Sequence, residues 1–151
     1  MDHRKFGDTY ILRIDKGEEI LEAIRTLCKT EDIALASVSG IGAVNDITLG
    51  VFNTEKFCYE SNRFTGDYEI SSCVGTATRM EGEPYLHIHM TIGNPIQGTC
   101  FAGHLNAAVV SLTGEFVIRQ IDGRVGRKYS PEVGLNLVEF EEHTEPEGSK
   151  I

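Results

Sequence analysis

The chain has 151 residues, of which 40% are hydrophobic and 25% are charged, and its formal net charge is −9. This length and composition are typical of one globular domain with a substantial core. Residues 1–5 are polar and no apolar run approaches the roughly 18 residues of a membrane span. We therefore expect a cytoplasmic protein with no membrane partner.

The N-terminal part of the chain predicts a strand, one main helix and a second strand. Residues 10–14 are typical of a strand, and residues 33–38 are typical of a buried one. Residues 18–29 carry apolar side chains at positions i, i+4, i+7 and i+8, which is the spacing of one helix face. These side chains are Ile20, Ile24, Leu27 and Cys28.

A glycine-containing motif follows in Ser39-Gly40-Ile41-Gly42-Ala43. It lacks the third glycine of a dinucleotide-binding loop and the lysine of a P-loop. We interpret it as a sharp turn between two strands, because glycine tolerates positive φ without any ligand.

The rest of the chain is predicted to be rich in strands. The candidate strands are residues 47–53, 68–80, 85–92, 99–101, 107–112 and 114–121. Short strands with tight turns favour antiparallel pairing, and the absence of βαβ alternation predicts an α+β fold. We expect an N-terminal segment at 1–8, one domain at 9–140 and an acidic, flexible tail at 141–151.

The four cysteines do not form a CxxC motif, which argues against a zinc ribbon or a thioredoxin-like site. Each lies among apolar neighbours, so we expect all of them to be buried and reduced. They are Cys28, Cys58, Cys73 and Cys100.

Two of the five histidines are separated by one residue in a predicted strand. His87 and His89 therefore lie on the same face, with backbones roughly 6.5–7 Å apart. Two imidazoles at this spacing can bind one metal ion. The alternate residues of this strand are predicted to point into the core: Leu86, Ile88 and Met90.

A third histidine follows after a segment rich in turn residues. Gly103 precedes His104 and allows close backbone approach, so His104 can face the pair on the other strand. Three imidazoles with one open position suit Zn²⁺ first, with Ni²⁺ or Fe²⁺ as alternatives. The remaining histidines, His3 and His143, lie near the chain ends and are expected to be solvated.

Two glutamates interrupt apolar strands and are candidate catalytic residues. Glu69 and Glu115 are candidates for proton transfer to or from a metal-bound water, since a three-histidine metal can acidify that water. The alternative is that each is an exposed carboxylate on a strand.

The basic residues near the end of the last predicted strand form a cluster in sequence: Arg119, Arg124, Arg127 and Lys128. We interpret the cluster as a solvated hairpin end, because charged residues near glycines are common in turns. Binding to DNA is the alternative, but 23 acidic residues against 14 basic ones oppose it.

Several of these motifs together resemble the plants-and-prokaryotes-conserved (PPC) domain in its stand-alone prokaryotic form. The resemblance extends over residues 9–140. The matching motifs are residues 10–14 with 17–20, 39–44, 66–70, 87–89, 103–105 and 113–116.

The resemblance implies a mixed, largely antiparallel sheet with one helix packed on it, assembled as a homotrimer. It also implies a metal site at His87, His89 and His104, close to a subunit boundary. The family carries a DNA-binding label because plant members join the domain to AT-hooks. This chain has no Arg-Gly-Arg-Pro motif, and Asp67 replaces the arginine of the family's Gly-Arg-Phe segment.

Three classes of function follow from these observations. The first is a metal-containing protein that binds a small ligand or carries a metal-dependent activity. The second is a DNA-binding regulatory or architectural protein, and the third is an adaptor whose trimer surface recruits another protein.

Overall fold

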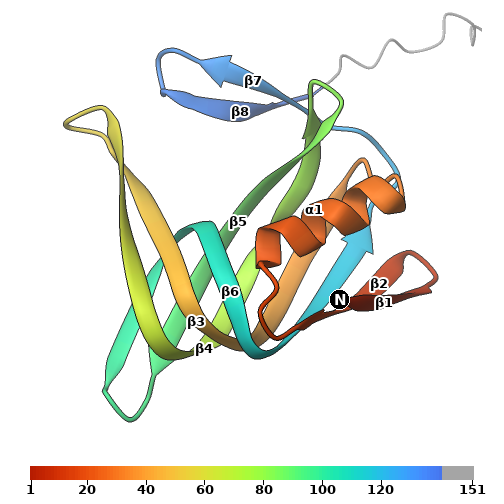
Figure 1. Cartoon of the computed structure of the whole chain (residues 1–151). Coiled ribbons are helices and arrows are strands. Elements are labelled where there is room, and N and C mark those ends of the chain that lie inside the picture. The colour runs from red at the N-terminus through yellow and green to blue at the C-terminus, as the bar shows by residue number, and fades with distance from the viewer. Residues whose placement is uncertain (141–151) are drawn as a thin grey trace, which may run out of the picture.

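The computed structural model describes residues 1–140, which form eight strands and one helix (Figure 1). The predicted tail and His143 lie outside these residues. The elements are β1 (Asp2–Phe6), β2 (Thr9–Asp15), α1 (Ile20–Thr30), β3 (Ala36–Asn53), β4 (Cys58–Met80), β5 (Glu83–Asn94), β6 (Thr99–Gln120), β7 (Gly126–Ser130) and β8 (Leu135–Glu139).

Six strands form one sheet in the order β1-β2-β6-β3-β4-β5, and β6 also pairs with β5. Strands β3 to β6 therefore close into a ring, while β7 and β8 form a separate hairpin. Every ladder between described strands is antiparallel, with no parallel ladder of the kind that a mixed sheet contains. The predicted α+β fold with one helix is confirmed.

Helix α1 covers the sheet with the apolar face that its sequence spacing predicts. Ile20, Ile24 and Leu27 are fully buried. Glu19 precedes the helix in extended conformation, and its side chain accepts a hydrogen bond from the Glu22 backbone. The helix therefore begins at Ile20 rather than at residue 18, since Glu19 is its N-cap.

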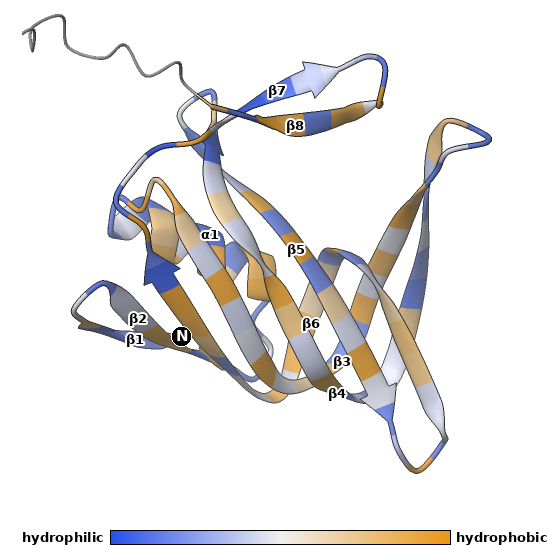
Figure 2. Cartoon of the chain, turned by 180° about the vertical axis from the view of Figure 1, so that it is seen from behind, coloured by the Kyte–Doolittle hydropathy of each residue, from blue (hydrophilic) through white to orange (hydrophobic). Residues whose placement is uncertain are grey.

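The core lies between α1 and the inner face of the strands. Apolar and polar residues alternate along the strands, as Figure 2 shows. This alternation places one face of each strand in the core. The large side chains that are fully buried on the strands include Leu12, Ile14, Ile47, Ile88, Met90, Ile92 and Phe116.

The prediction of a sharp turn at Gly40 and Gly42 is wrong, because β3 continues through both glycines. A Cβ atom at Gly40 would lie 2.3 Å from the Phe116 ring, and one at Gly42 would lie 2.4 Å from the Thr113 carbonyl oxygen. The ladder to β4 shifts register between these glycines, which indicates a β-bulge. The glycines allow β6 to approach a bent strand.

Several predicted strands are parts of longer ones. The segments 99–101, 107–112 and 114–121 belong to the single strand β6, and 47–53 is the end of β3. Residues 2–6, predicted to lie in a separate N-terminal segment, form β1 and pair with β2. Tertiary pairing on both sides of β3 and β6 keeps these strands extended through positions that favour turns in isolation.

Cys28 and Cys73 are buried, as predicted, but Cys58 and Cys100 are exposed. The prediction for these two is wrong because Cys58 begins β4 beside a hairpin turn and Cys100 lies at the start of β6. Apolar neighbours in sequence do not bury a residue at the end of a strand. All four cysteines are free thiols.

Candidate metal centre

Strand β5 presents His87 and His89 on its outer face. The residues between and after them, Ile88 and Met90, are each 1% exposed and point into the core. This confirms the prediction from the alternation of side chains along a strand. The histidines are therefore held on the surface by a strand whose opposite face is anchored in the core.

Strand β6 brings the third histidine to the same place. His104 is the direct ladder partner of His89 in the β5–β6 pair. Directly opposed residues of an antiparallel pair point to the same face, with Cβ atoms about 4.5–5.5 Å apart. The predicted convergence of imidazoles from two separate segments is therefore present in the fold.

The three rings surround a common point. Their centroids are 5.2 Å apart for His87 and His89, 5.3 Å for His87 and His104, and 5.5 Å for His89 and His104. One nitrogen from each ring lies within 4.8 Å of the other two. Tetrahedral binding at 2.0–2.1 Å requires nitrogens about 3.3 Å apart, so the rings must rotate toward one another to bind an ion.

The chemistry of this donor set fits a divalent transition metal. Neutral imidazoles are ligands for zinc, nickel and iron. No group within residues 1–140 makes a hydrogen bond to any of the three rings, so their nitrogens are free to bind an ion. Three protein ligands leave a coordination position for water or another ligand.

The surroundings favour the neutral form of two of these histidines. Partial burial is the main cause that lowers the pKa of His87 below 6.5, with smaller contributions from the charges of His89 and Arg127. Partial burial also lowers the pKa of His104, followed by the charges of His87 and His89. Because a metal binds the neutral imidazole, these shifts favour binding near neutral pH.

Glycines permit the close strand packing that holds the histidines. A Cβ atom at Gly75 on β4 would lie 2.1 Å from the His87 carbonyl oxygen and 2.7 Å from the Ile88 Cα atom. A Cβ atom at Gly103 would lie 2.9 Å from the Gly50 carbonyl oxygen. The backbone positions of His87 and His104 therefore depend on small residues on neighbouring strands.

Aromatic side chains that the sequence analysis did not identify lie beside the histidines. The Tyr59 ring meets the His104 ring edge to face at 6.1 Å, and its hydroxyl donates a hydrogen bond to Asn106 at 2.7 Å. Tyr85 lies two residues before His87 and belongs to the same face of β5. The sequence could have indicated that Tyr85 lies beside the histidines, because it is two residues from His87 on a predicted strand. It gives no such indication for Tyr59, which comes from a hairpin far away in sequence.

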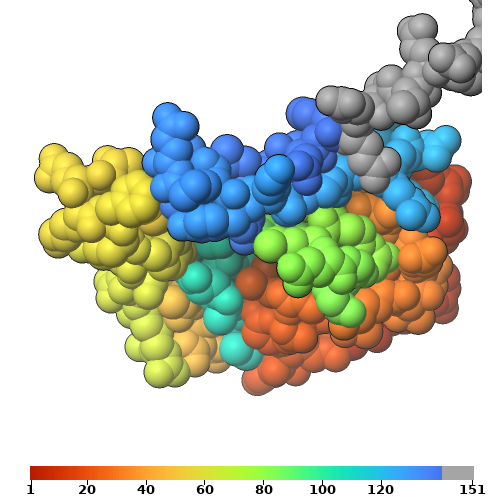
Figure 3. Space-filling view, turned by 90° about the horizontal axis from the view of Figure 1, so that it is seen from above, coloured from red at the N-terminus to blue at the C-terminus, as the bar shows by residue number. Residues whose placement is uncertain are grey.

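The β7–β8 hairpin is a further neighbour. Figure 3 shows it between the β3–β4 hairpin and the β4–β5 turn. Arg127 on β7 donates a hydrogen bond to Thr78 on β4, and its guanidinium lies 4.9 Å from the Tyr85 ring centroid. At its other end, Gly134 approaches the rings of Phe52 and Phe57. The hairpin thus borders the outer face that carries the histidines.

A family model for the Plants and Prokaryotes Conserved (PCC) domain matches residues 1–122. The chain belongs to this family. It is the same family that the sequence motifs resemble, so that prediction is confirmed. No curated protein matches the chain.

Solved structures of similar proteins support the PCC fold. A protein from Bacteroides thetaiotaomicron described as a "putative DNA binding protein" is 36% identical, with a TM-score of 0.88, and the match covers 92% of this chain and 96% of that one. A PPC protein from Pyrococcus horikoshii is 35% identical, with a TM-score of 0.80 and coverage of 89% and 93%. A protein from Archaeoglobus fulgidus described as metal-containing is 28% identical, with a TM-score of 0.80 and coverage of 88% and 94%.

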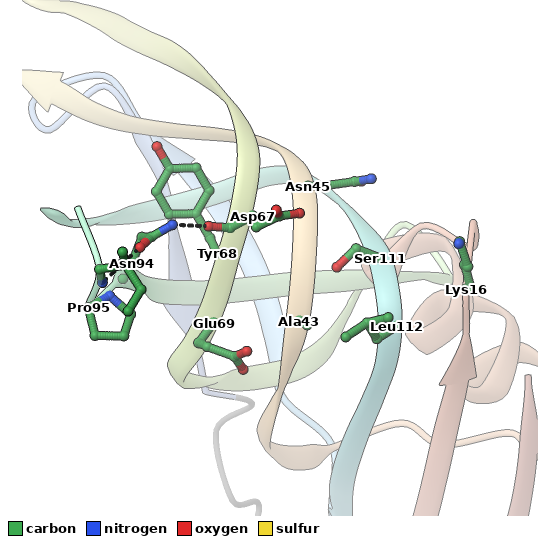
Figure 4. Close-up of a pocket in the computed structure, with 12 residues that line it drawn as sticks. Lys16, Ala43, Asn45, Asp67, Tyr68, Glu69, Asn94, Pro95, Ser111 and Leu112 are labelled. Atoms are coloured by element: carbon green, nitrogen blue, oxygen red, sulfur yellow. Dashed lines mark hydrogen bonds between the residues drawn. The ribbon is translucent and has the colours of Figure 1, made fainter. Parts of the chain in front are cut away.

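The two candidate glutamates of this PCC-domain protein do not lie with its histidines. Glu69 lines a hollow of about 540 Å³, shown in Figure 4, where Asn94 donates a hydrogen bond to the Asp67 carbonyl oxygen. Glu115 lines a different hollow together with Ile41. Both side chains are exposed.

The basic cluster of the PCC-domain protein is divided between different contacts. Arg119 pairs with Asp8 at 3.2 Å, and Lys128 lies 3.5 Å from Glu139. Arg127 instead turns toward β4. Three of the four cluster residues therefore contact different parts of the fold. Within residues 1–140, the single helix is too short and too polar to cross a bilayer.

Proposed function

We propose that this PCC-domain protein holds a divalent metal ion at His87, His89 and His104 and uses it to bind a small ligand or to carry out a metal-dependent reaction. The observation that supports this best is the convergence of three imidazoles within 4.8 Å from two strands. The description of the Archaeoglobus fulgidus relative as metal-containing agrees with it. Zinc is the expected metal, with nickel and iron as alternatives.

A bound metal would act as a Lewis acid and would lower the pKa of a water molecule at its open position. The chain itself supplies three imidazoles on the paired strands β5 and β6. His87 and His89 are exposed, so a ligand from solvent can reach the ion. Glu69 and Glu115 remain candidates for proton transfer, but a role for either beside the metal requires contact between subunits.

Elemental analysis of the untreated protein tests this proposal. The wild-type chain should carry about one metal ion, and anomalous scattering from a crystal should place it between the three rings. The double variant His87→Ala, His89→Ala should lose the ion, whereas His3→Ala, which removes a histidine elsewhere, should keep it. Metal retained by the double variant would refute the proposed ligands.

We propose that the chain assembles as a homotrimer in the cytoplasm. In support, exposed apolar side chains lie in register across the outer face of the sheet: Ile11 on β2, Val117 on β6 and Val74 on β4. The same row continues to His89 on β5. Sedimentation velocity should give the mass of a trimer for the wild-type chain and a smaller species for Val117→Glu.

DNA binding is the second candidate function. Its support is the description of the Bacteroides thetaiotaomicron relative as a "putative DNA binding protein". Electrostatic attraction to phosphates is strongest at low salt. A gel shift at low and at physiological salt decides the question, and no shift at low salt would reject this function.

A further inference from the structure

Arg127 has an unusual set of contacts for an arginine of this chain. Its Nε donates to the Thr78 hydroxyl at 3.1 Å, its Nη1 to the Asn136 carbonyl oxygen at 3.4 Å and its Nη2 to the Thr76 hydroxyl at 3.4 Å. The guanidinium also lies over the Tyr85 ring. These contacts come from β4, β5 and β8, so they fix the position of the charged group.

The charge of Arg127 has no carboxylate partner among residues 1–140. Six of the eight arginines pair with a carboxylate: Arg4, Arg13, Arg25, Arg63, Arg79 and Arg119. The acceptors of Arg127 are two hydroxyls and a carbonyl, which are all neutral. The side chain is half-buried, where an uncompensated charge costs more than at the surface. The chain has more acidic than basic residues, so carboxylates are available to pair with an arginine. The absence of such a pair at Arg127 among residues 1–140 therefore suggests that its charge serves another partner.

The guanidinium lies next to the histidine site. Thr76, which accepts the hydrogen bond from Nη2, is the direct ladder partner of His87. Tyr85, the ring beneath the guanidinium, is on the same strand face as His87. Directly opposed residues and next-but-one residues are the nearest neighbours on a sheet face. The positive charge therefore borders the histidine site on the side of His87.

The hydrogen-bonding capacity of Arg127 is not exhausted. A guanidinium has five N–H donors in a planar fork. The contacts with protein use one N–H on each of the three nitrogens. One N–H therefore remains on Nη1 and one on Nη2 without a protein acceptor among residues 1–140, and both can donate to the oxygens of a carboxylate or a phosphate.

We propose that the ligand of this site is a small oxyanion, a carboxylate or a phosphate, with one oxygen on the metal and the others facing Arg127. This inference rests on the proposed metal site and adds the class of its ligand. Arg127 acts as a specificity-determining residue, since a neutral ligand gains nothing from its charge. Thr76 and Thr78 hold the guanidinium in place, and the Tyr85 ring supports it by a cation–π contact.

Spectroscopic titration of the Co²⁺-loaded full chain tests the inference, because Co²⁺ absorption reports changes at the open coordination position. Inorganic phosphate and acetate are the anionic probes, and imidazole is the neutral probe. Arg127→Gln should weaken binding of both anions roughly 10- to 100-fold, the loss expected for charged hydrogen bonds. It should leave the imidazole affinity unchanged. Arg124→Gln is the matched control, since it removes the same charge from the same segment at an exposed position.

Each outcome has a distinct meaning. Equal anion affinity in Arg127→Gln and wild type overturns the inference. A parallel loss of phosphate and imidazole affinity also overturns it, because Arg127 would then only support the structure of the site. Weaker binding of phosphate but not acetate restricts the ligand to phosphates, and the reverse restricts it to carboxylates. Failure of the wild-type chain to bind Co²⁺ at all refutes the proposed metal site itself, and the inference with it.

Discussion

His89 and His104 are directly opposed across the β5–β6 ladder, with ring centroids 5.5 Å apart. The pair comes from strands that are joined by the short turn between Asn94 and Thr99. Because antiparallel partners share a face, this register alone brings His104 to the two histidines of β5. The register of one strand pair therefore determines whether the site exists.

Each histidine should be required for tight metal binding. Substitution His104→Ala should lower the Zn²⁺ affinity by at least about 100-fold, because loss of a direct ligand should exceed the 10–100-fold effect typical of outer-shell partners. Competition with a chromophoric chelator measures this. His3→Ala is the control, since His3 lies near Glu31 instead. Equal affinities for these two variants would contradict the prediction.

Metal affinity should fall as the pH falls, because a proton and the metal compete for each imidazole nitrogen. Three imidazole ligands give a limiting slope of about three in log affinity per pH unit, and His104→Ala should reduce this slope to about two. The lowered pKa values of His87 and His104 move the loss of metal affinity that comes from protonation of these two ligands below pH 6.5. Chelator competition from about pH 5 to pH 8 measures the profile. The same slope in both proteins would be inconsistent with His104 as a ligand.

The same shifts affect the stability of the metal-free chain. Since the folded-state pKa of His87 and of His104 is below the unfolded value of 6.5, the unfolded chain binds protons more readily. This contribution to stability is fully present above pH 6.5 and is lost as the pH falls through the folded-state values. The free energy of unfolding of the apo-protein, measured in urea, should therefore decrease as the pH falls between these limits. In the double variant His87→Ala, His104→Ala, the free energy of unfolding should decrease less over the same pH range than in the wild-type chain.

The sequence predicts the parts of the site that depend on local periodicity. The two-residue spacing of His87 and His89 on a strand, and the inward direction of Ile88 between them, follow from the alternation of side chains. The apolar face of α1 follows from the helix period in the same way. These features need no knowledge of which strands pair.

The remaining features depend on contacts between distant segments. Gly40 is a residue type that favours turns, but in the fold the Phe116 ring packs against it and β3 continues through it as an extended strand. Arg127 belongs to the site only because the β7–β8 hairpin folds back onto β4. Cys100 has apolar neighbours in sequence but lies at the exposed start of a strand. Local sequence carries no signal for such contacts.

Packing of β4 against β5 at Gly75 should be necessary for both stability and metal binding. A methyl group at Gly75 would meet backbone atoms of His87 and Ile88, which cannot move aside without separating the strands. Gly75→Ala should therefore destabilise the chain by about 1–3 kcal/mol and weaken Zn²⁺ binding. Urea unfolding of the apo-protein, followed by circular dichroism, measures the first effect.

Gly93→Ala on β5 is the matched control for this substitution. A Cβ atom at Gly93 would lie 3.5 Å from the Thr99 carbonyl oxygen and 3.7 Å from the Ser71 hydroxyl, which are ordinary contacts. This variant should change the free energy of unfolding by no more than about 0.5 kcal/mol. The prediction fails if both alanine variants are equally stable.

Two of the four thiols should be reactive in the native protein, and the other two should be protected. Cys58 and Cys100 are exposed, whereas burial raises the pKa of Cys28 to about 11 and that of Cys73 to about 12. The thiolate is the reactive form, so the buried thiols are protected both by their pKa values and by lack of access. Ellman's reagent should therefore label two thiols rapidly in the native protein and all four in urea. Cys58→Ser combined with Cys100→Ser should remove the rapid phase. Rapid labelling that persists in this double variant would show that β4 or α1 opens locally under native conditions, contrary to the packing of Cys28 and Cys73 in the core.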